Sequence, residues 1–251
     1  MSRPRVDRED ELNLLQRLVD GQTPIRIALI QAESGMGKSE LVREFVSRLL
    51  PRQLTYVVID FKGGGLSLAD VFFHLGDTLG WKQFPTLTTS IQRLAQPTTV
   101  NITGNVQIGQ NEISVALYAP DEQTRDARRA DLTNGLIIDL RRLERGVLIF
   151  DVFEKCDPTL QPWFASVFLP AIHRSPNLTV IIAGQITPEQ TQMWECEHLT
   201  LPGIAPEHWQ EYANAVGATV TLDFIRGCCV ALKGRCINIA QVLEAQGGNR
   251  P

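Results

Sequence analysis

The stretch that decides the fold is Ile25–Ser39, which reads IRIALIQAESGMGKS. The apolar run over 25–30 predicts a short strand that is buried on both faces of a parallel sheet. Residues 38–50 have apolar side chains at helical spacing, and we predict a helix that ends before Pro51. Strand, glycine-bearing loop and helix together form the pattern of a phosphate-binding loop, with Ala32 where the strict pattern has Gly.

This loop carries a definite chemistry. Gly35 and Gly37 allow backbone N–H groups to face phosphate oxygens, and the N-terminus of the following helix adds its positive dipole. Lys38 is expected to reach the β- and γ-phosphates, and Ser39 to place its hydroxyl on Mg²⁺. A plain connection between strand and helix is the alternative, but Gly-Lys-Ser after a further Gly is a poor sequence for one. We therefore predict a nucleotide site that includes Ser34, Gly35, Met36, Gly37, Lys38, Ser39 and Glu40.

Outward from this loop, strands and helices alternate. We predict further strands at 55–61, 147–151 and 178–183, and helices at 7–21, 67–79, 125–145 and 160–173. This alternation indicates an α/β fold, a three-layer αβα core with a parallel sheet and right-handed crossovers.

The chain divides by pattern into three parts. An N-terminal segment and helix cover 1–22, the core covers 23–200, and a small helical lid covers 201–251 with helices at 206–216 and 222–246. Within the core, Val and Ile recur at two-residue spacing over 97–120, where we expect an inserted hairpin or a mobile loop.

The second half of the site is expected at the end of the strand 147–151. Asp151 ends this strand and would hold magnesium directly or through a water. Glu154, three residues on, can orient or deprotonate the attacking water if the chain turns there. Asp151 as a turn or cap residue, and Glu154 as a solvated charge, are the alternatives.

Composition and net charge limit the classes of protein to which this chain can belong. The 251 residues are 43% hydrophobic and 21% charged, which excludes a disordered chain. No apolar run approaches the roughly 20 residues of a membrane span, and the N-terminus lacks the apolar segment of a signal peptide, so we expect a cytoplasmic protein without a membrane partner. Net charge of −4 argues against nucleic acid as the main partner. The five cysteines are expected as thiols, with Cys196 and His198 in a surface loop more readily than on a metal.

With these motifs in hand, the chain resembles the P-loop ATPase core of the STAND class, the signal-transduction ATPases with numerous domains within the AAA+ group, in its bacterial type. Residues 148–155, LIFDVFEK, are similar to the Asp-x-x-Glu-Lys form of the Walker B motif. Residues 6–12, VDREDEL, resemble the family's segment before the first helix, which implies that Val6 and Arg8 contact the base or ribose.

The resemblance also identifies departures. Relatives commonly carry Arg after the strand corresponding to 178–183, whereas this chain has Gln185, which can donate a hydrogen bond to a γ-phosphate but brings no charge. Arg235 weakly resembles the lid arginine of AAA+ proteins, and a solvated side chain is its alternative.

These features favour an ATP-dependent molecular switch with ATP/ADP and Mg²⁺ as cofactors, slow ATP hydrolysis, and a protein partner or self-association. The second hypothesis is a nucleotide-binding scaffold with weak catalysis, in which residues 97–120 lend an edge strand to a partner. The third is an AAA+ motor or loader on nucleic acid, against which the negative net charge weighs.

Overall fold

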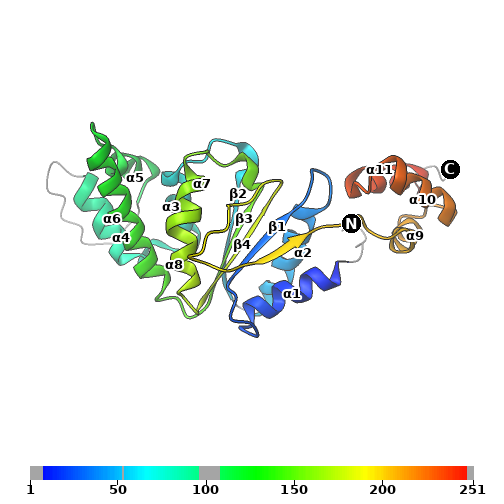
Figure 1. Cartoon of the computed structure of the whole chain (residues 1–251), viewed down its shortest axis with the longest axis horizontal. Helices are drawn as coiled ribbons and strands as arrows, with labels where there is room; N and C mark the ends of the chain where they lie inside the picture. The colour runs from blue at the N-terminus through cyan, green and yellow to red at the C-terminus, as the bar shows by residue number, and fades with distance from the viewer. Residues whose placement is uncertain (1–7, 53, 96–107, 248–251) are drawn as a thin grey trace.

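The computed structural model describes residues 8–52, 54–95 and 108–247. At the centre of Figure 1 is a five-stranded sheet in which every pairing is parallel and the strand order is β2-β3-β4-β1-β5. The strands are β1 (Ile27–Gln31), β2 (Thr55–Asp60), β3 (Gly146–Asp151), β4 (Leu178–Gly184) and β5 (Glu197–Thr200). The predicted α/β class and parallel sheet are confirmed, while β5 falls where we expected a loop.

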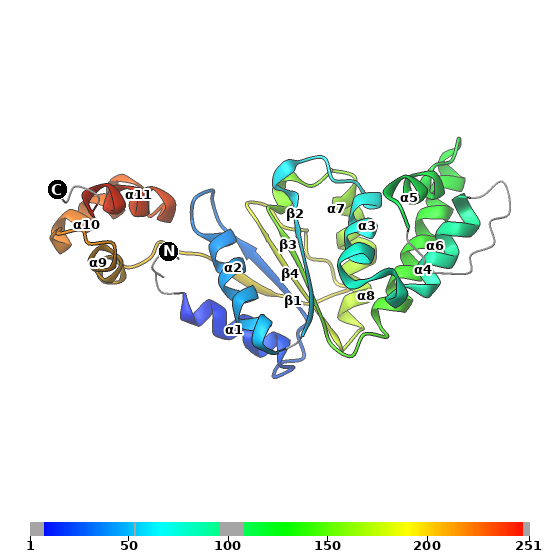
Figure 2. The same ribbon diagram turned by 180° about the vertical axis from the view of Figure 1, so that it is seen from behind.

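Helices cover both faces of the sheet, as Figures 1 and 2 show from opposite sides. On one face lie α1 (Glu9–Val19) and α2 (Lys38–Leu49), and on the other α3 (Leu68–Leu79), α7 (Leu160–Trp163) and α8 (Leu169–His173). Alternate strand residues divide between the two faces: Leu148 and Phe150 of β3 join one hydrophobic cluster, and Val147 and Ile149 join the other. This two-sided burial is the reason that the strands read as continuous apolar runs.

Three helices pack together at one end of the molecule, and the second of them lies within the expected insertion. They are α4 (Pro85–Ala95), α5 (Gln110–Leu117) and α6 (Glu122–Leu140). The expectation of a hairpin or loop is wrong over 110–117, where Ile113 and Ala116 are buried against the core on one side of a helix. Residues 96–107 of the predicted insertion lie outside the described residues.

The predicted lid contains three helices with their own hydrophobic cluster, at the opposite end of the molecule from α4–α6 in Figure 1. Its helices are α9 (Pro206–Ala215), α10 (Leu222–Ala231) and α11 (Cys236–Gly247). One helix over 222–246 was expected, but the chain breaks between α10 and α11, where Lys233 and Gly234 have φ values of 52° and 68°. Left-handed residues cannot continue a right-handed helix, so the lid gains a corner there.

None of the described helices is long and apolar enough to cross a membrane.

Candidate functional site

The phosphate-binding loop connects β1 to α2 at the carboxyl edge of the sheet. Gly35 has φ 85°, and Gly37, the residue that caps α2, has φ 91°, so both need the conformational freedom of glycine. Lys38 begins the helix, and its Nζ donates to the carbonyl oxygens of Ala32 at 2.7 Å and Glu33 at 3.0 Å. The loop therefore wraps around the ammonium group of Lys38.

Lys38 is buried to 8% exposure and lies within the field of two carboxylates. Burial lowers the pKa of Lys38, and the charges of Glu154 and Asp151 oppose this shift. A cation held between these acids and the loop carbonyls is placed to meet negative charge that enters the loop.

Ser39 and Asp151, the two predicted magnesium ligands, lie together. Ser39 is in the first turn of α2, and Asp151 ends β3, which is separated from β1 only by β4. Burial raises the pKa of Asp151, a hydrogen bond from Ser39 and one from the Val152 N–H oppose the rise, and the charges of Asp60 and Glu154 add to it. A buried carboxylate beside a hydroxyl is an oxygen donor set that fits Mg²⁺, and a divalent cation would offset the repulsion among these acids.

Glu154 lies on the same edge, but its carboxylate is paired in a way that the sequence did not indicate. The Gln185 backbone N–H donates to Oε2 at 2.9 Å, and the Gln185 side-chain amide donates to Oε1 at 3.0 Å. Burial would raise the pKa of Glu154, but the two hydrogen bonds from Gln185, with the charge of Lys38, hold this pKa below its usual value.

Asp60 lies beside the candidate site, and sequence reasoning missed it. It ends β2 and is the register partner of Asp151 across the sheet, and its charge is one of the causes that raise the pKa of Asp151. A signal was present, because an acidic residue at the end of a predicted parallel strand must lie at the same edge as the other strand ends. Its side chain accepts a hydrogen bond from the Lys62 N–H, which holds it at this edge.

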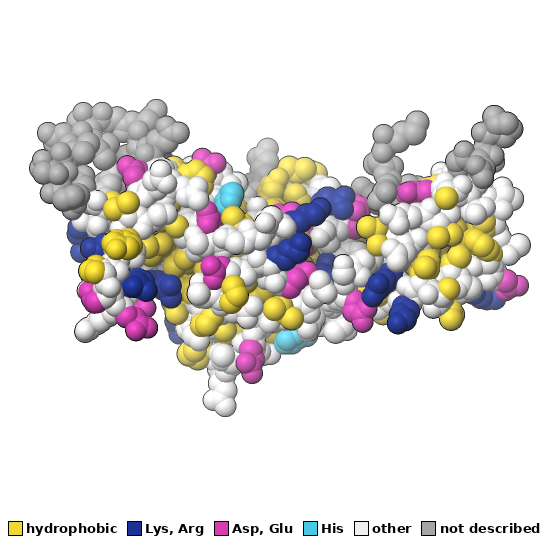
Figure 3. All heavy atoms as spheres, turned by 90° about the horizontal axis from the view of Figure 1, so that it is seen from above, with side chains coloured by type: hydrophobic (Ala, Val, Ile, Leu, Met, Phe, Trp, Pro, Cys, Tyr) yellow, Lys and Arg dark blue, Asp and Glu magenta, His cyan; other side chains and the backbone are white. Residues whose placement is uncertain are grey.

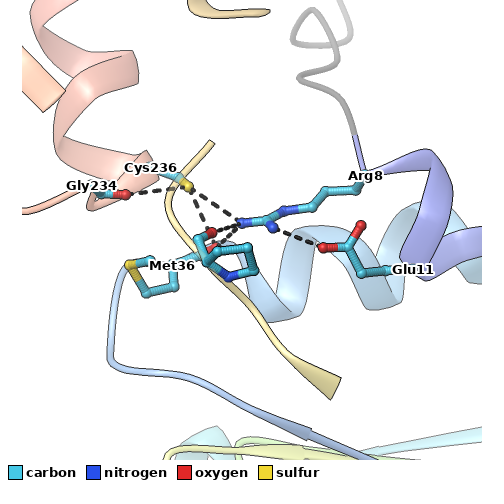
Figure 4. Close-up of polar contacts among 6 residues, drawn as sticks. Arg8, Glu11, Met36, Gly234 and Cys236 are labelled. Carbon is cyan, nitrogen blue, oxygen red and sulfur yellow. Dashed lines mark hydrogen bonds and ion pairs between the residues drawn. The ribbon is translucent and has the colours of Figure 1, made fainter. Parts of the chain in front are cut away.

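Arg8 joins the phosphate-binding loop to the lid, as Figure 4 shows. Its guanidinium donates to the carbonyls of Pro202 at 2.8 Å and Met36 at 3.3 Å, and pairs with Glu11 at 2.9 Å. The Cys236 thiol donates to the same Met36 carbonyl at 3.4 Å. Arg8 is therefore beside the predicted site, where its guanidinium bridges backbone carbonyls; Val6 lies outside the described residues.

The first turn of α11 rests on the loop itself. The Ile237 N–H donates to the Gly35 carbonyl at 3.1 Å, and a Cβ added at Gly35 would lie 3.1 Å from the Ile237 side chain. Arg235 pairs with Glu33 at 3.5 Å, so this arginine contacts the loop although nearly half of its side chain is exposed.

Other predicted residues are less central. Ser34 is exposed on the loop, and Glu40 is exposed on α2 and pairs with Arg43 at 2.6 Å. Cys196, just before β5, has its Sγ 3.2 Å from Nε2 of His198, which lies within β5. Burial, with the charge of Glu197, raises the pKa of Cys196 to about 11, which keeps the thiol protonated. Among the described residues there is no group of three His, Cys, Asp or Glu side chains that could hold a metal ion.

Comparisons with known proteins bear on the fold. No family model matches the chain, and no curated protein matches it either. Among solved structures, it is similar to a Walker-type ATPase of Pyrococcus abyssi, with a TM-score of 0.58 and 14% identity over 98% of this chain and 68% of that one. A STAND protein with a tetratricopeptide repeat sensor from Pyrococcus horikoshii gives the same TM-score and identity over 96% of this chain and 30% of that one.

A third similar structure is the Drosophila ORC bound to DNA, with a TM-score of 0.52 and 14% identity over 96% of this chain and 60% of that one. At such identities the likeness concerns the fold, since one fold carries many functions. Together with the loop between β1 and α2, these neighbours show that the chain has the α/β fold of P-loop ATPases.

Proposed function

We propose that the chain binds ATP with Mg²⁺, hydrolyses it slowly, and acts as a nucleotide-dependent switch of the STAND type. The observation that carries the proposal is the convergence of Lys38, Ser39, Asp151 and Glu154 at one edge of the sheet. These residues supply a phosphate-binding cation, two magnesium ligands and a proton acceptor, the parts that phosphoryl transfer from a nucleotide needs.

Each residue has a part in the reaction. The N–H groups of the loop and of the first turn of α2 bind the phosphates, and Lys38 exchanges the carbonyls of Ala32 and Glu33 for phosphate oxygens. Ser39 and Asp151 would hold the magnesium ion, which would neutralise charge on the phosphates. Glu154 accepts a proton as the water oxygen bonds to the γ-phosphorus; the bond from that phosphorus to the β–γ bridging oxygen breaks, which yields ADP and phosphate.

The lid contact supports the switch. Ile237 and Cys236 of α11 bond to the carbonyls of Gly35 and Met36, so a change in the loop that moves either carbonyl alters the seating of the lid. Nucleotides that hold the loop differently would therefore favour different lid positions, which a protein partner or a second copy of the chain could recognise.

Isothermal titration with ATP and ADP in magnesium tests nucleotide binding. Lys38→Ala should abolish binding, whereas Lys82→Ala, an exposed lysine before α4, should bind as the wild type does. Wild-type affinity in Lys38→Ala would remove the proposal.

Hydrolysis is tested separately. Glu154→Gln should retain ATP binding and lose turnover, because the amide cannot accept the proton. Unchanged turnover in Glu154→Gln would favour the alternative, a nucleotide-binding scaffold without catalysis.

We propose protein, and not nucleic acid, as the partner. On the face of the molecule in Figure 3, basic and acidic side chains are interspersed, and the net charge is −4. Nucleic-acid binding depends on clustered cations that release counterions, so ATPase activity should show no DNA- or RNA-dependent stimulation at low salt. Stimulation that falls steeply as salt rises would revive the motor or loader hypothesis.

A further inference from the structure

The turn that follows β4 engages both carboxylate oxygens of Glu154. The backbone N–H and the side-chain amide of Gln185 bind one oxygen each, at 2.9 and 3.0 Å. The Gln31 side-chain amide donates to the Gln185 carbonyl at 3.1 Å, which ties the same turn to the end of β1. The backbone carbonyl of Gln185 is thus bound by Gln31, while its N–H and its side-chain amide bind the carboxylate of Glu154.

Two features of the backbone allow this pairing. Val152 has φ 57° and ψ 41°, a left-handed conformation that is unfavourable for a β-branched residue. It turns the chain out of β3, so that Phe153 enters the core and Glu154 comes to lie beside β4. At Gly184, an added Cβ would lie 3.1 Å from Glu154 Oε2 and 2.4 Å from the Ile186 carbonyl oxygen. The pairing therefore has a strained turn on one strand and a required glycine on the other.

We propose that Gln185 is a positioning residue that restrains Glu154 and slows ATP hydrolysis, in place of binding the γ-phosphate. This rests on the proposed function, since it assigns a regulator to the same site. Hydrogen bonds to the charged form of a carboxylate make it a weaker proton acceptor. Of the charged groups, Lys38 on α2 attracts the Glu154 carboxylate and Asp151 on β3 repels it.

Kinetics provide the first test. Gln185→Met keeps the length of the side chain and removes its amide group. Gln185→Ala removes the amide group and also shortens the side chain. Each should raise kcat about three- to tenfold while the affinity for ATP stays within about twofold, because the lost hydrogen bond belongs to the base and not to the phosphate. Gln83→Met, at an exposed glutamine before α4, is the matched control and should leave kcat unchanged. A fall in kcat, or a loss of ATP affinity beyond tenfold, overturns the proposal.

A second measurement needs no turnover. In ¹⁵N-glutamine-labelled protein without nucleotide, the side-chain amide signals of Gln185, assigned by their loss in Gln185→Met, should shift in Glu154→Ala and stay in place in Glu189→Ala. Glu189 is an exposed carboxylate four residues further along the chain. Unshifted Gln185 signals in Glu154→Ala would overturn the restraint even in an active enzyme. Failure of the proposed function would instead appear as unaltered ATP binding in Lys38→Ala, and the amide signals would still decide whether Gln185 holds Glu154.

Discussion

Asp151 combines a position proposed to bind magnesium with an environment that disfavours its charge. The residue is only 6% exposed, and burial is the largest cause of its raised pKa. A carboxyl whose pKa is raised by folding favours the folded state when protonated, and this contribution is lost as pH rises through the folded pKa. At neutral pH the ionised Asp151 therefore destabilises the protein in the absence of magnesium.

Asp151→Asn should accordingly raise Tm at pH 7 by about 2–4 °C, the effect of about 1 kcal/mol in a chain of this length, while it weakens magnesium-dependent ATP binding. The gain should shrink as pH falls and Asp151 itself becomes protonated. Asp157→Asn is the contrasting variant: hydrogen bonds from Thr159 lower the pKa of Asp157, so the substitution should not raise Tm. Thermal melts across pH decide the matter, and a gain that persists at low pH would contradict this account.

Gly184 leaves no room for a side chain. Gly184→Ala brings a Cβ to 2.4 Å from the Ile186 carbonyl oxygen, so the turn after β4 must move, and we expect a loss of about 1–3 kcal/mol in unfolding free energy. Gly63→Ala, at a glycine with nothing within 4 Å of its added Cβ, should change stability little. Urea titration of both variants measures the difference; equal midpoints would show that the turn adapts freely.

At the residue scale, the sequence indicated Lys38, Ser39, Asp151, Glu154 and Gln185 as site residues, but it did not indicate how Glu154 and Gln185 are paired, and Asp60 was overlooked. Lys38, Ser39 and Asp151 follow from the loop and from the end of a buried strand, and the structure brings them together. The pairing of Gln185 with Glu154 requires the left-handed Val152, and a β-branched residue gives no warning of that conformation.

Among the elements, α11 and the phosphate-binding loop are both contacted by Arg8. The Arg8 side chain is only 10% exposed and bonds to carbonyls of the loop and of the link to the lid. Arg8→Ala should therefore speed hydrogen exchange at the Ile237 amide by about tenfold, since a lost charge-assisted hydrogen bond lowers the cost of opening. Arg43→Ala, which removes an exposed ion pair on α2, is the control. Unchanged exchange in Arg8→Ala would mean that α11 is seated by other contacts.

The strands that are buried on both faces of the sheet were predicted correctly. The prediction failed in a segment whose secondary structure is determined by tertiary packing. The strands β1 to β4 read directly from their apolar runs. Residues 110–117 have Ile113, Val115 and Leu117 at alternate positions, which favoured a strand, yet the segment packs as a helix with Ile113 inward and Val115 exposed. The pattern of two-residue spacing was too short to distinguish the periods.

On the scale of the whole molecule, the lid has a hydrophobic cluster separate from those on the two sheet faces. Nucleotide bound by the core should stabilise the folded protein by mass action: MgATP at about 100 times its Kd adds ~2.7 kcal/mol, or about 5–10 °C in Tm. Lys38→Ala should show no such shift. Scanning fluorimetry at several ATP concentrations measures it, and an equal rise in both proteins would place the nucleotide elsewhere.

Within the described residues, the backbone passes from the sheet to the lid once, through the stretch between β5 and α9, and Arg8 grips the Pro202 carbonyl in that stretch. The link between sheet and lid is therefore fixed by a residue from the N-terminal part of the sequence, and the lid can turn about this fixed point. A partner that displaces α9–α11 would act on the phosphate-binding loop through this point. It would also act through the hydrogen bonds from the first turn of α11 to the carbonyls of Gly35 and Met36. A force on the lid would then displace the loop, and the same displacement would change how the loop binds phosphate.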